Sequence, residues 1–446
     1  MTVRRTLPCA LAVAALAGCL ALTVTRGGTL GDRTPLYAWY AADAALFALA
    51  LLLLRRVPRR LVARLVLAGG VLVAAVGLLA PPRTSDDAYR YVWDGRVQAA
   101  GTSPYAHTPA DPALAWLRDG GLFPSGRCTG WDERRTADGG CTRINRPAVH
   151  TVYPPVAELW FLAQHPFGDG VRRAQAAGAL LAVATTGALL AVTRGGRRAA
   201  LWAWCPGVTV WAVNDAHVDT LGALLTVLGL AAAARRRPVA GGALLGAATA
   251  VKLLPALALP GALSGVLARR PTRADGLLLA SAAGAFALAY LPYLLASGPA
   301  VLGYLPGYLR EEGYDQGHLD RFGLLRLVLP DALAPAAAAL LLGAVVLRVL
   351  RRGDPDRPWH GALQVSGTAL LLAAPGYPWY GLLVVALAAL DGGWEWLAVP
   401  AAGQLLYLAG GSDVQQLAYG GALVIVLAAA AARRRAAGAA PVMTRG

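Results

Sequence analysis

Two adjacent aspartates, Asp86 and Asp87, have the residue type and the setting for acid–base chemistry. They follow an apolar run and open the polar stretch SDDAYRYVWDGRVQAAGTSPY, which begins at Ser85. A carboxylate at a membrane surface, partly removed from water, can take the proton of an acceptor hydroxyl as a general base. The residues from Thr84 onward also fit a capping box at a helix start. The sequence does not show which aspartate would face a cleft.

A second polar group interrupts apolar sequence further along the chain. Four hydrogen-bonding or ionisable residues fall within six positions: Asn214, Asp215, His217 and Asp219. Such groups are costly at membrane depth unless they face water, a cavity or a ligand. His217 and Asp219 are therefore candidates to contact a sugar or a phosphate. A cap between two helices is the structural alternative, and a metal site is disfavoured because the ligand set is thin.

Two basic residues are candidates to hold a phosphate. Lys252 is the only lysine of the chain and stands in the apolar stretch GALLGAATAVKLLPALALP. A cation in that setting can neutralise a buried phosphate, or it can snorkel from a helix end to the membrane interface. Arg90 lies in the first polar stretch, and a guanidinium suits bidentate phosphate binding. Pairing with an aspartate or an anionic lipid is the plainer explanation for Arg90.

Aromatic residues beside prolines form two turns, with Tyr153 in VYPP and Trp379 and Tyr380 in PGYPWY. Aromatic rings stack on sugar faces and contact polyprenyl chains, but they also form the interfacial belt of membrane proteins. A further polar segment, 304–323, fits either a substrate-facing loop or a solvated connector.

The rest of the chain is typical of membrane-embedded helices, which must position these groups. Of its 446 residues, 57% are hydrophobic and only 15% are charged, too few polar residues for a soluble protein of this size. Apolar stretches long enough for helical spans recur at 7–24, 37–54, 61–80, 174–192, 276–296, 332–350 and 414–432. The composition predicts one all-α polytopic membrane domain over residues 1–446, a bundle of about 11–14 helices if short apolar stretches also cross.

The formal charge of +16 comes from arginine clusters between the apolar runs. This arrangement is the positive-inside pattern, so we expect membrane lipids rather than nucleic acid among the partners. Threading the chain with each cluster in the cytoplasm places both termini there, and it places segment 81–153 outside as an extracytoplasmic catalytic loop with short helices. Cys128 and Cys141 fall in this loop, where an oxidising compartment allows a disulfide. Two free thiols or a metal pair are the alternatives.

The order of these segments carries a family resemblance. The five that carry it are YRYVWDGRVQAAGTSPY, INRPAVHTVYPP, NDAHVDTLGALL, AVKLLPALALP and PGYPWY. Together they resemble the polyprenyl-phosphate-mannose-dependent mannosyltransferases of glycosyltransferase family 87, within the GT-C superfamily. The resemblance implies inverting transfer of a sugar, mannose above all, from a polyprenyl-phosphate donor to a lipid or polysaccharide acceptor of the cell envelope. The reaction would take place on the extracytoplasmic face of the plasma membrane.

The resemblance also implies roles for particular residues. The catalytic base would be Asp86 or Asp87, and the donor phosphate would be held by basic residues such as Lys252, His217 and Arg90. No cofactor is predicted, and the need for a metal is left open. Segment 123–143 looks like an insertion relative to the pattern, which leaves the acceptor undefined. A transporter or flippase of lipid-linked sugars is the main alternative, but it should show inverted repeats with broken helices, and none is visible. A non-catalytic membrane subunit would leave the polar segments unexplained.

Overall fold

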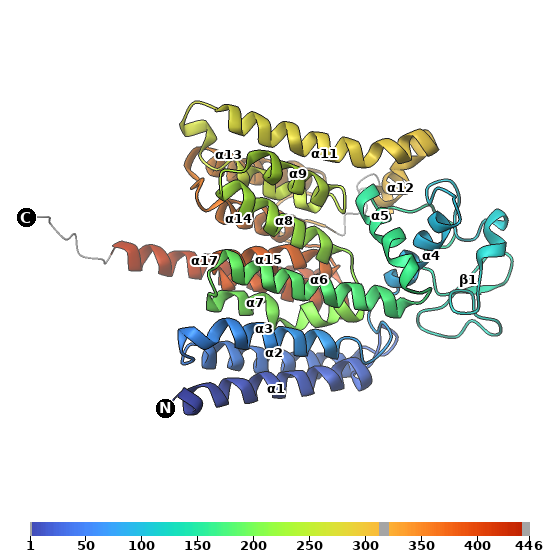
Figure 1. Ribbon diagram of the computed structural model, residues 1–446, viewed down its shortest axis with the longest axis horizontal. Coiled ribbons are helices and arrows are strands. Elements are labelled where there is room, and N and C mark those ends of the chain that lie inside the picture. Colours follow the sequence, from blue (N-terminus) through green and yellow to red (C-terminus); the bar gives the residue numbers. More distant parts are fainter. Residues whose placement is uncertain (1, 312–320, 439–446) are drawn as a thin grey trace, which may run out of the picture.

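Long apolar helices form most of the molecule, and a segment of short helices and loops extends from one end of them (Figure 1). The computed structural model describes residues 2–311 and 321–438. Part of the polar segment 304–323, including His318 and Asp320, lies outside the described residues. The predicted all-α polytopic architecture is confirmed, since the described chain is mostly helical with almost no strand and several helices are long and apolar.

The chain begins with three helices, and the polar extension follows them. The three helices are α1 (Thr2–Arg26), α2 (Thr34–Leu54) and α3 (Arg59–Val76). The extension contains α4 (Asp87–Ala99), η1 (Pro112–Leu117), β1 (Arg134–Arg135), β2 (Cys141–Thr142), α5 (Pro155–Gln164) and η2 (His165–Phe167). The two short strands pair antiparallel, with Arg135 opposite Cys141.

The remaining helices complete the bundle. In chain order they are α6 (Val171–Val192), η3 (Arg197–Ala199), α7 (Ala200–Ala203), η4 (Val208–Asn214), α8 (Asp219–Ala234), α9 (Pro238–Thr249), η5 (Leu254–Ala258), α10 (Leu259–Ala262), η6 (Val266–Ala268), α11 (Arg273–Ser297), η7 (Gly298–Leu302), α12 (Leu305–Glu311), η8 (Leu325–Leu327), η9 (Asp331–Leu333), α13 (Ala334–Arg352), α14 (Pro358–Ala373), η10 (Pro378–Gly381), α15 (Leu382–Asp391), η11 (Trp394–Leu397), α16 (Ala398–Ala409) and α17 (Ser412–Gly438).

Six of the described helices are long and apolar enough to cross a membrane, or up to seven if the bent pair η4 and α8 is one span. The six contain α1, α2, α6, α11, α13 and α17, and each coincides with a stretch identified from the sequence. The seventh such stretch, 61–80, becomes α3, which ends at Val76. A count of 11–14 would require shorter apolar helices such as α9 to cross as well.

The core of the bundle centres on α15. Each residue from Leu382 to Leu390 is at most 6% exposed, as expected of a helix that is hydrophobic on all sides. The helix packs against α6, α8 and α14. Because α15 follows η10 without a break, its burial fixes the position of Trp379 and Tyr380 at one end of the core.

Small residues bring α9 and α11 into close contact. A Cβ added at Gly242 or Gly246 would lie 2.1 Å from the carbonyl oxygen of Leu278 or Ala282, respectively. Glycines four residues apart let two helix backbones approach in this way, which is a common packing mode within membranes.

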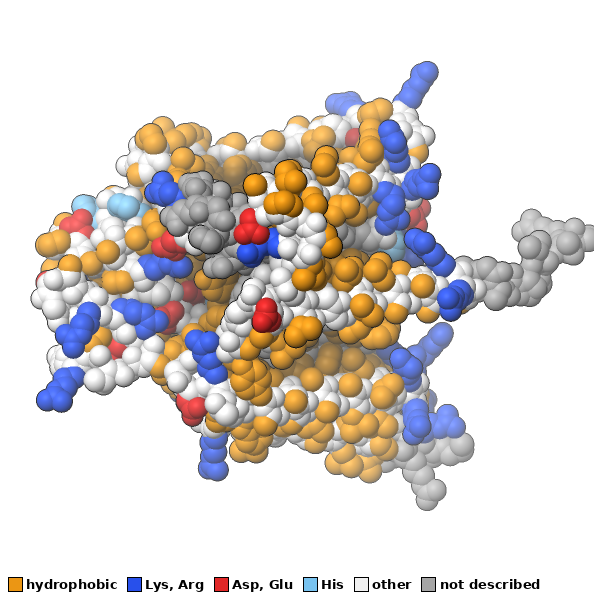
Figure 2. All heavy atoms as spheres, turned by 180° about the vertical axis from the view of Figure 1, so that it is seen from behind, with side chains coloured by type: hydrophobic (Ala, Val, Ile, Leu, Met, Phe, Trp, Pro, Cys, Tyr) orange, Lys and Arg blue, Asp and Glu red, His pale blue; other side chains and the backbone are white. Residues whose placement is uncertain are grey.

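The two ends of the bundle differ in composition. Both termini lie at one end, and α4, α5 and β1 lie at the other (Figure 1). Basic side chains crowd the end that carries the termini, whereas basic and acidic side chains are mixed at the other end (Figure 2). Arginines from different clusters hold the first end together: Arg197 donates to the carbonyl oxygen of Leu54, and Arg236 pairs with Asp356.

Candidate active site

A sharp bend between η4 and α8 forms the base of the site. The axes of these two helices differ by 112°, and Ala216 at the bend has φ of +56°. η4 is a π-helix, a form that is frequent at functional sites. The residues of the bend are almost completely buried. The bend therefore brings polar side chains and the N-terminus of α8 to one place at the end of the apolar bundle.

Asn214 and Asp215 tie the segment that precedes α4 to this bend. The Nδ2 of Asn214 donates to the carbonyl oxygens of Gly77 and Ala80. Asp215 accepts hydrogen bonds from the backbone N–H groups of Arg83 and Thr84, and from the Thr84 hydroxyl. These two side chains are thus occupied by the protein itself, which agrees with the structural alternative for this part of the motif.

The tied segment leads directly into α4 and its two aspartates. Asp86 is the residue before the helix, and its side chain makes no capping bond, so the capping-box alternative does not describe it. The Nδ2 of Asn145 bridges the two carboxylates, at 3.0 Å from Oδ1 of Asp86 and 2.6 Å from Oδ1 of Asp87. Asp86 also pairs with Arg134 of β1 at 2.8 Å. The two neighbours therefore have different surroundings.

The surroundings also change the proton affinity of the two carboxylates. Burial raises the pKa of Asp86 to about 6, with a further contribution from the charge of Asp87 and an opposing one from Arg134. Burial raises the pKa of Asp87 too, and Lys252, Asn145 and other donors oppose this rise. A carboxylate with a raised pKa is a stronger base in the neutral range.

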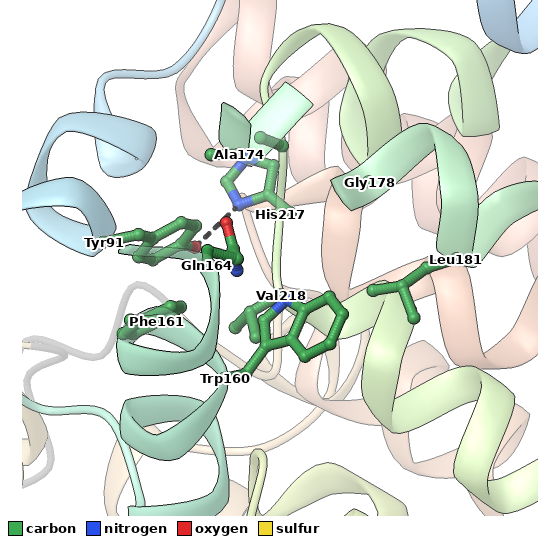
Figure 3. Close-up of a pocket in the computed structure, with 10 residues that line it drawn as sticks. Tyr91, Trp160, Phe161, Gln164, Ala174, Gly178, Leu181, His217 and Val218 are labelled. Atoms are coloured by element: carbon green, nitrogen blue, oxygen red, sulfur yellow. Dashed lines mark hydrogen bonds between the residues drawn. The ribbon is translucent and has the colours of Figure 1, made fainter. Parts of the chain in front are cut away.

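His217 lies beside Oδ2 of Asp87, the carboxylate oxygen that Asn145 does not contact. Its Nδ1 is 3.5 Å from Oδ2 of Asp87 and 3.5 Å from the Tyr91 hydroxyl (Figure 3). The imidazole stacks on Trp379 with ring centres 3.8 Å apart. His217 is 1% exposed, and its Nε2 has no hydrogen-bond partner among the described residues. Tyr153 packs edge-to-face against Tyr91 on this side, with ring centres 5.0 Å apart.

Lys252 pairs with Asp219, the first residue of α8. Nζ of Lys252 is 2.8 Å from Oδ2 of Asp219, and it lies 4.3 Å from the ring centre of Tyr380. The Lys252 charge also acts on Asp87. A partner 33 residues away explains how a lone lysine is accommodated in apolar sequence. Of the three aromatics predicted to contact sugar, Trp379 and Tyr380 each already use a ring face to support His217 or Lys252.

A second cation reaches the same region from the loop. Arg146 has φ of +46° and pairs with Glu311 of α12 at 2.9 Å. The charge of Asp87 contributes to its electrostatic environment. Arg146 and Asn145 both lie in the sequence motif INRPAVHTVYPP, but nothing in the motif marks them as neighbours of Asp87. Only the return of the loop over α4 does so.

Arg90, in contrast, points away from this group. Its Nε is 3.0 Å from both carboxylate oxygens of Asp94, and its Nη1 donates to the carbonyl oxygen of Val149. The residue is 4% exposed. The structure thus gives Arg90 an aspartate partner, as in the plainer sequence-based explanation, and does not place it where it could reach a phosphate beside Asp87.

Cys128 and Cys141 are joined by a disulfide that closes the loop carrying β1 and β2. With Glu133 they form the one group among the described residues whose spacing fits a metal ion, and the disulfide removes both thiolates from it. The hairpin is the element that presents Arg134 to Asp86. The segment described as an insertion is therefore part of the site.

Two small cavities flank the polar group. The first lies behind His217, with apolar walls that include Trp160, Phe161, Leu181 and Val218 (Figure 3). The second lies beside Lys252 and Asp219 and is lined by residues such as Leu254, Tyr380 and Leu383. Each cavity has room for only about one water molecule, so neither is by itself the binding site of a lipid-linked sugar.

The comparison with known families agrees with this geometry. The family model of glycosyltransferase family 87 matches residues 151–375, just over half of the chain. No curated protein and no solved structure matches the chain. The matched range includes Tyr153, His217, Asp219 and Lys252, whereas Asp86 and Asp87 lie before it and Trp379 and Tyr380 after it.

Proposed function

Because the chain belongs to glycosyltransferase family 87, we propose that it transfers a sugar from a polyprenyl-phosphate donor to a lipid or glycan of the cell envelope. That it is a glycosyltransferase rather than a flippase follows from the family. The polyprenyl-phosphate donor is proposed from the resemblance, and because the charged groups lie at the end of an apolar helix bundle. Mannose is proposed as the sugar from the resemblance to mannose-transferring members.

One observation carries the proposal: a carboxylate, Asp87, lies within the electrostatic reach of two cations from different elements, Lys252 and Arg146. In a direct displacement, the acceptor hydroxyl attacks the anomeric carbon and its proton passes to Asp87. The bond between that carbon and the phosphate oxygen breaks, and the polyprenyl phosphate leaves with the electron pair. A single displacement of this kind inverts the anomeric configuration. The site must therefore supply a base on one side and positive charge on the other.

Asp87 is the stronger candidate for the base. Asp86 is held by Arg134 and Asn145, so both of its oxygens have partners. Asp87 uses Oδ1 for Asn145, and its Oδ2 faces His217 at 3.5 Å, beyond a normal hydrogen bond. Its side chain is 19% exposed, so an acceptor can reach it. We assign Asp86 to positioning, through Asn145.

The two cations are suited to different tasks. Arg146 and Glu311 are 42% and 40% exposed, respectively, and an exposed ion pair contributes only about 0–1 kcal/mol. A phosphate can therefore replace Glu311 on Arg146 at little cost. Lys252 and Asp219 are 19% and 6% exposed, and breaking a buried pair is much more costly. We assign Arg146 to direct phosphate binding and Lys252 to a fixed charge beside it.

His217 can contribute a further contact. Its Nε2 has no partner among the described residues and adjoins the first cavity. A buried nitrogen without a partner is costly, so a hydroxyl of the donor or acceptor sugar, or a water molecule, would be stabilised there. Trp379 holds the imidazole in place by stacking.

The sidedness of the reaction remains a proposal of the same kind. Disulfides persist in oxidising compartments, and the disulfide lies at the site end of the molecule, opposite the arginine clusters and both termini (Figures 1 and 2). The positive-inside rule then favours an active site on the extracytoplasmic face of the plasma membrane and cytoplasmic termini.

The donor class can be tested with purified full-length protein in proteoliposomes. Polyprenyl-phosphate mannose, polyprenyl-phosphate glucose and a nucleotide-activated mannose, each radiolabelled in the sugar, would be offered with extracted envelope lipids as acceptors. We expect transfer from polyprenyl-phosphate mannose and none from the nucleotide sugar. Transfer from the nucleotide sugar alone would overturn the donor class, and equal use of both polyprenyl donors would overturn the choice of mannose.

A further inference from the structure

A second group of buried charges lies close to the proposed base but is not part of it. Between α4 and α5, Arg90, Asp94 and Glu158 are 4%, 1% and 0% exposed, respectively. Arg90 holds Asp94 through Nε, at 3.0 Å from both carboxylate oxygens. The group therefore contains two carboxyls and a single guanidinium, all shielded from water.

The hydrogen bonds that the Glu158 carboxyl accepts within the described chain come from residues other than Arg90. Its Oε1 accepts from the Thr151 hydroxyl at 2.7 Å, and its Oε2 accepts from Nε2 of Gln98 at 2.9 Å. Nη1 of Arg90 is directed to Val149, and its Nη2 has no hydrogen-bond partner in the described part of the chain. Glu158 and Asp94 share Gln98, whose Nε2 donates to the backbone oxygen of Asp94 and to Oε2 of Glu158, and the two carboxyls act electrostatically on each other. Two ionised carboxylates in this position would leave one buried negative charge without a counter-ion, which is strongly unfavourable.

We propose that Asp94 and Glu158 share one proton, carried by Glu158, and that this proton-linked group is a positioning device for Asp87. Glu158 donates the proton in a hydrogen bond to ionised Asp94, and Arg90 neutralises the remaining charge. Glu158 is thus a positioning residue rather than a catalytic one, and its role rests on the proposed function of Asp87.

The connection to Asp87 runs along two segments. Arg90 and Asp94 lie about one and two turns after Asp87 on α4, so the group fixes the rotation of the helix. Val149 and Thr151, which Arg90 and Glu158 hold, precede Tyr153. Tyr153 in turn packs against Tyr91, which lies about one turn after Asp87 on α4. Loss of the shared proton would place like charges on α4 and α5 and push these segments apart.

The other groups facing the pair support the same protonation state. Burial raises the pKa of Glu158 well above its usual range, and the charge of Asp94 raises it further. Burial also raises the pKa of Asp94, but Arg90 opposes that rise. The titratable neighbours from the adjoining loop and from α11 are tyrosines, Tyr105 and Tyr293, the latter through Gln98. Arg90 is thus the cation that acts on both carboxyls.

Variants of Glu158 distinguish two roles for this residue: it either contributes a shared proton or contributes a buried negative charge. Glu158→Gln keeps the shape and has an amide N–H that can replace the proton toward Asp94, whereas Glu158→Ala removes the bond. With purified full-length protein and polyprenyl-phosphate mannose, we expect kcat of E158Q within about threefold of the wild type at pH 7. The kcat of E158A should fall by roughly 10–100-fold, because a displacement near 1 Å at a catalytic group can cost about a hundredfold. If E158Q is as impaired as E158A at every pH, the residue acts as a charge and the proposal is wrong.

The pH profile gives a sharper readout. Wild-type kcat should fall at alkaline pH as Glu158 loses its proton, and E158Q should not show that fall. Glu395→Gln is a matched control, because Glu395 is also 1% exposed but pairs with Arg433 far from the site. E395Q should keep the wild-type profile. An alkaline fall that is identical in the wild type and E158Q would overturn the proposal.

An infrared measurement is independent of transfer activity. A protonated carboxyl group has a carbonyl stretch distinct from that of a carboxylate, so the spectrum at pH 7 should contain a band that E158Q lacks and E395Q retains. Absence of this difference would overturn the shared proton even if transfer is normal. Presence of the band in a protein that does not use polyprenyl-phosphate mannose would instead refute the proposed function and leave the proton assignment standing.

Discussion

Substitution of Asp87 by Asn is the most direct test of the proposed chemistry. The Asn side chain has nearly the same shape and keeps an oxygen that can accept from Asn145, but it cannot take a proton from an acceptor hydroxyl. General-base catalysis typically contributes about 10²–10⁴-fold. We therefore expect kcat of D87N to fall by this factor, equivalent to roughly 3–5 kcal/mol in the barrier.

Asp86→Asn provides the matched comparison, because it changes the adjacent residue in the same way. The oxygen that accepts from Asn145 is retained, and the loss is the ion pair with Arg134. The Arg134 side chain is 41% exposed, so it stays solvated and the pair contributes only about 0–1 kcal/mol. This corresponds to a rate loss of no more than about fivefold. The two variants should thus differ by at least about 20-fold in kcat.

The measurement is the initial rate of transfer from radiolabelled polyprenyl-phosphate mannose to extracted envelope lipids, at saturating donor. Size-exclusion profiles and thermal unfolding in the same detergent would show that both variants are folded. If D86N loses as much activity as D87N, or more, Asp86 is the base and the assignment from hydrogen-bond occupancy is wrong. If both retain full activity, neither aspartate carries out the chemistry.

Three further outcomes follow from the charges around Asp87. Arg146→Gln should raise the donor KM by about tenfold or more, since it removes a charge-assisted contact to phosphate. Arg135→Gln, on the exposed face of β1, should leave the donor KM unchanged. Equal KM values for the two variants would exclude direct phosphate binding by Arg146. Lys252→Met leaves Asp219 buried without its partner, so it should lower the unfolding temperature of the purified protein as well as the transfer rate. An unchanged melting curve would contradict the assignment of Lys252 as a fixed internal charge. Because burial raises the pKa of Asp87 above its ordinary value, the transfer rate should fall on acidification while the pH is still above the usual aspartate range near 4; a rate that is constant down to that range would refute a buried base.

The sequence predicted the helices well because their signal is local. Apolar runs of the required length coincide with α1, α2, α6, α11, α13 and α17. A run such as 276–296 needs only its own residues to indicate a span. Shorter helices such as α9 carry a weaker signal, because they are stabilised by contacts such as those of Gly242 and Gly246 with α11. The number of crossings could therefore not be fixed from hydropathy.

The candidate site was predicted in part, for a similar reason. Polar residues in apolar surroundings are conspicuous, which is how His217, Asp219 and Lys252 were identified, and the structure brings them together. Their pairing is a tertiary feature: the sequence does not show that Lys252 would meet Asp219. Arg90 was proposed for the phosphate from its residue type and from the resemblance, and in the structure its Nε pairs with Asp94 on α4.

Asn145, and the position of Arg146 beside it, illustrate what pattern reasoning cannot reach. The sequence offers Arg146 only as one of several arginines of the loop, among them Arg90, Arg96 and Arg143. Neither residue type is unusual in a loop, and Asn145 lies 58 residues from the aspartate that it holds. Their position depends on the path of segment 100–154, which its own small core sets. That core includes Trp93 of α4 and Ile144 next to Asn145.

The family match excludes Asp86 and Asp87. The bend at Asn214 and Asp215, which lies within the match, nevertheless holds the segment that leads to them. The matched range begins at residue 151, yet Asp215 within it fixes Arg83 and Thr84 by three hydrogen bonds. Tyr407 of α16 donates to the carbonyl oxygen of the same Thr84. The segment before Asp86 is therefore held by the matched part of the bundle and by a helix beyond it. The segment that carries the proposed base lies outside the matched range, but the matched part of the bundle helps to determine where that segment begins.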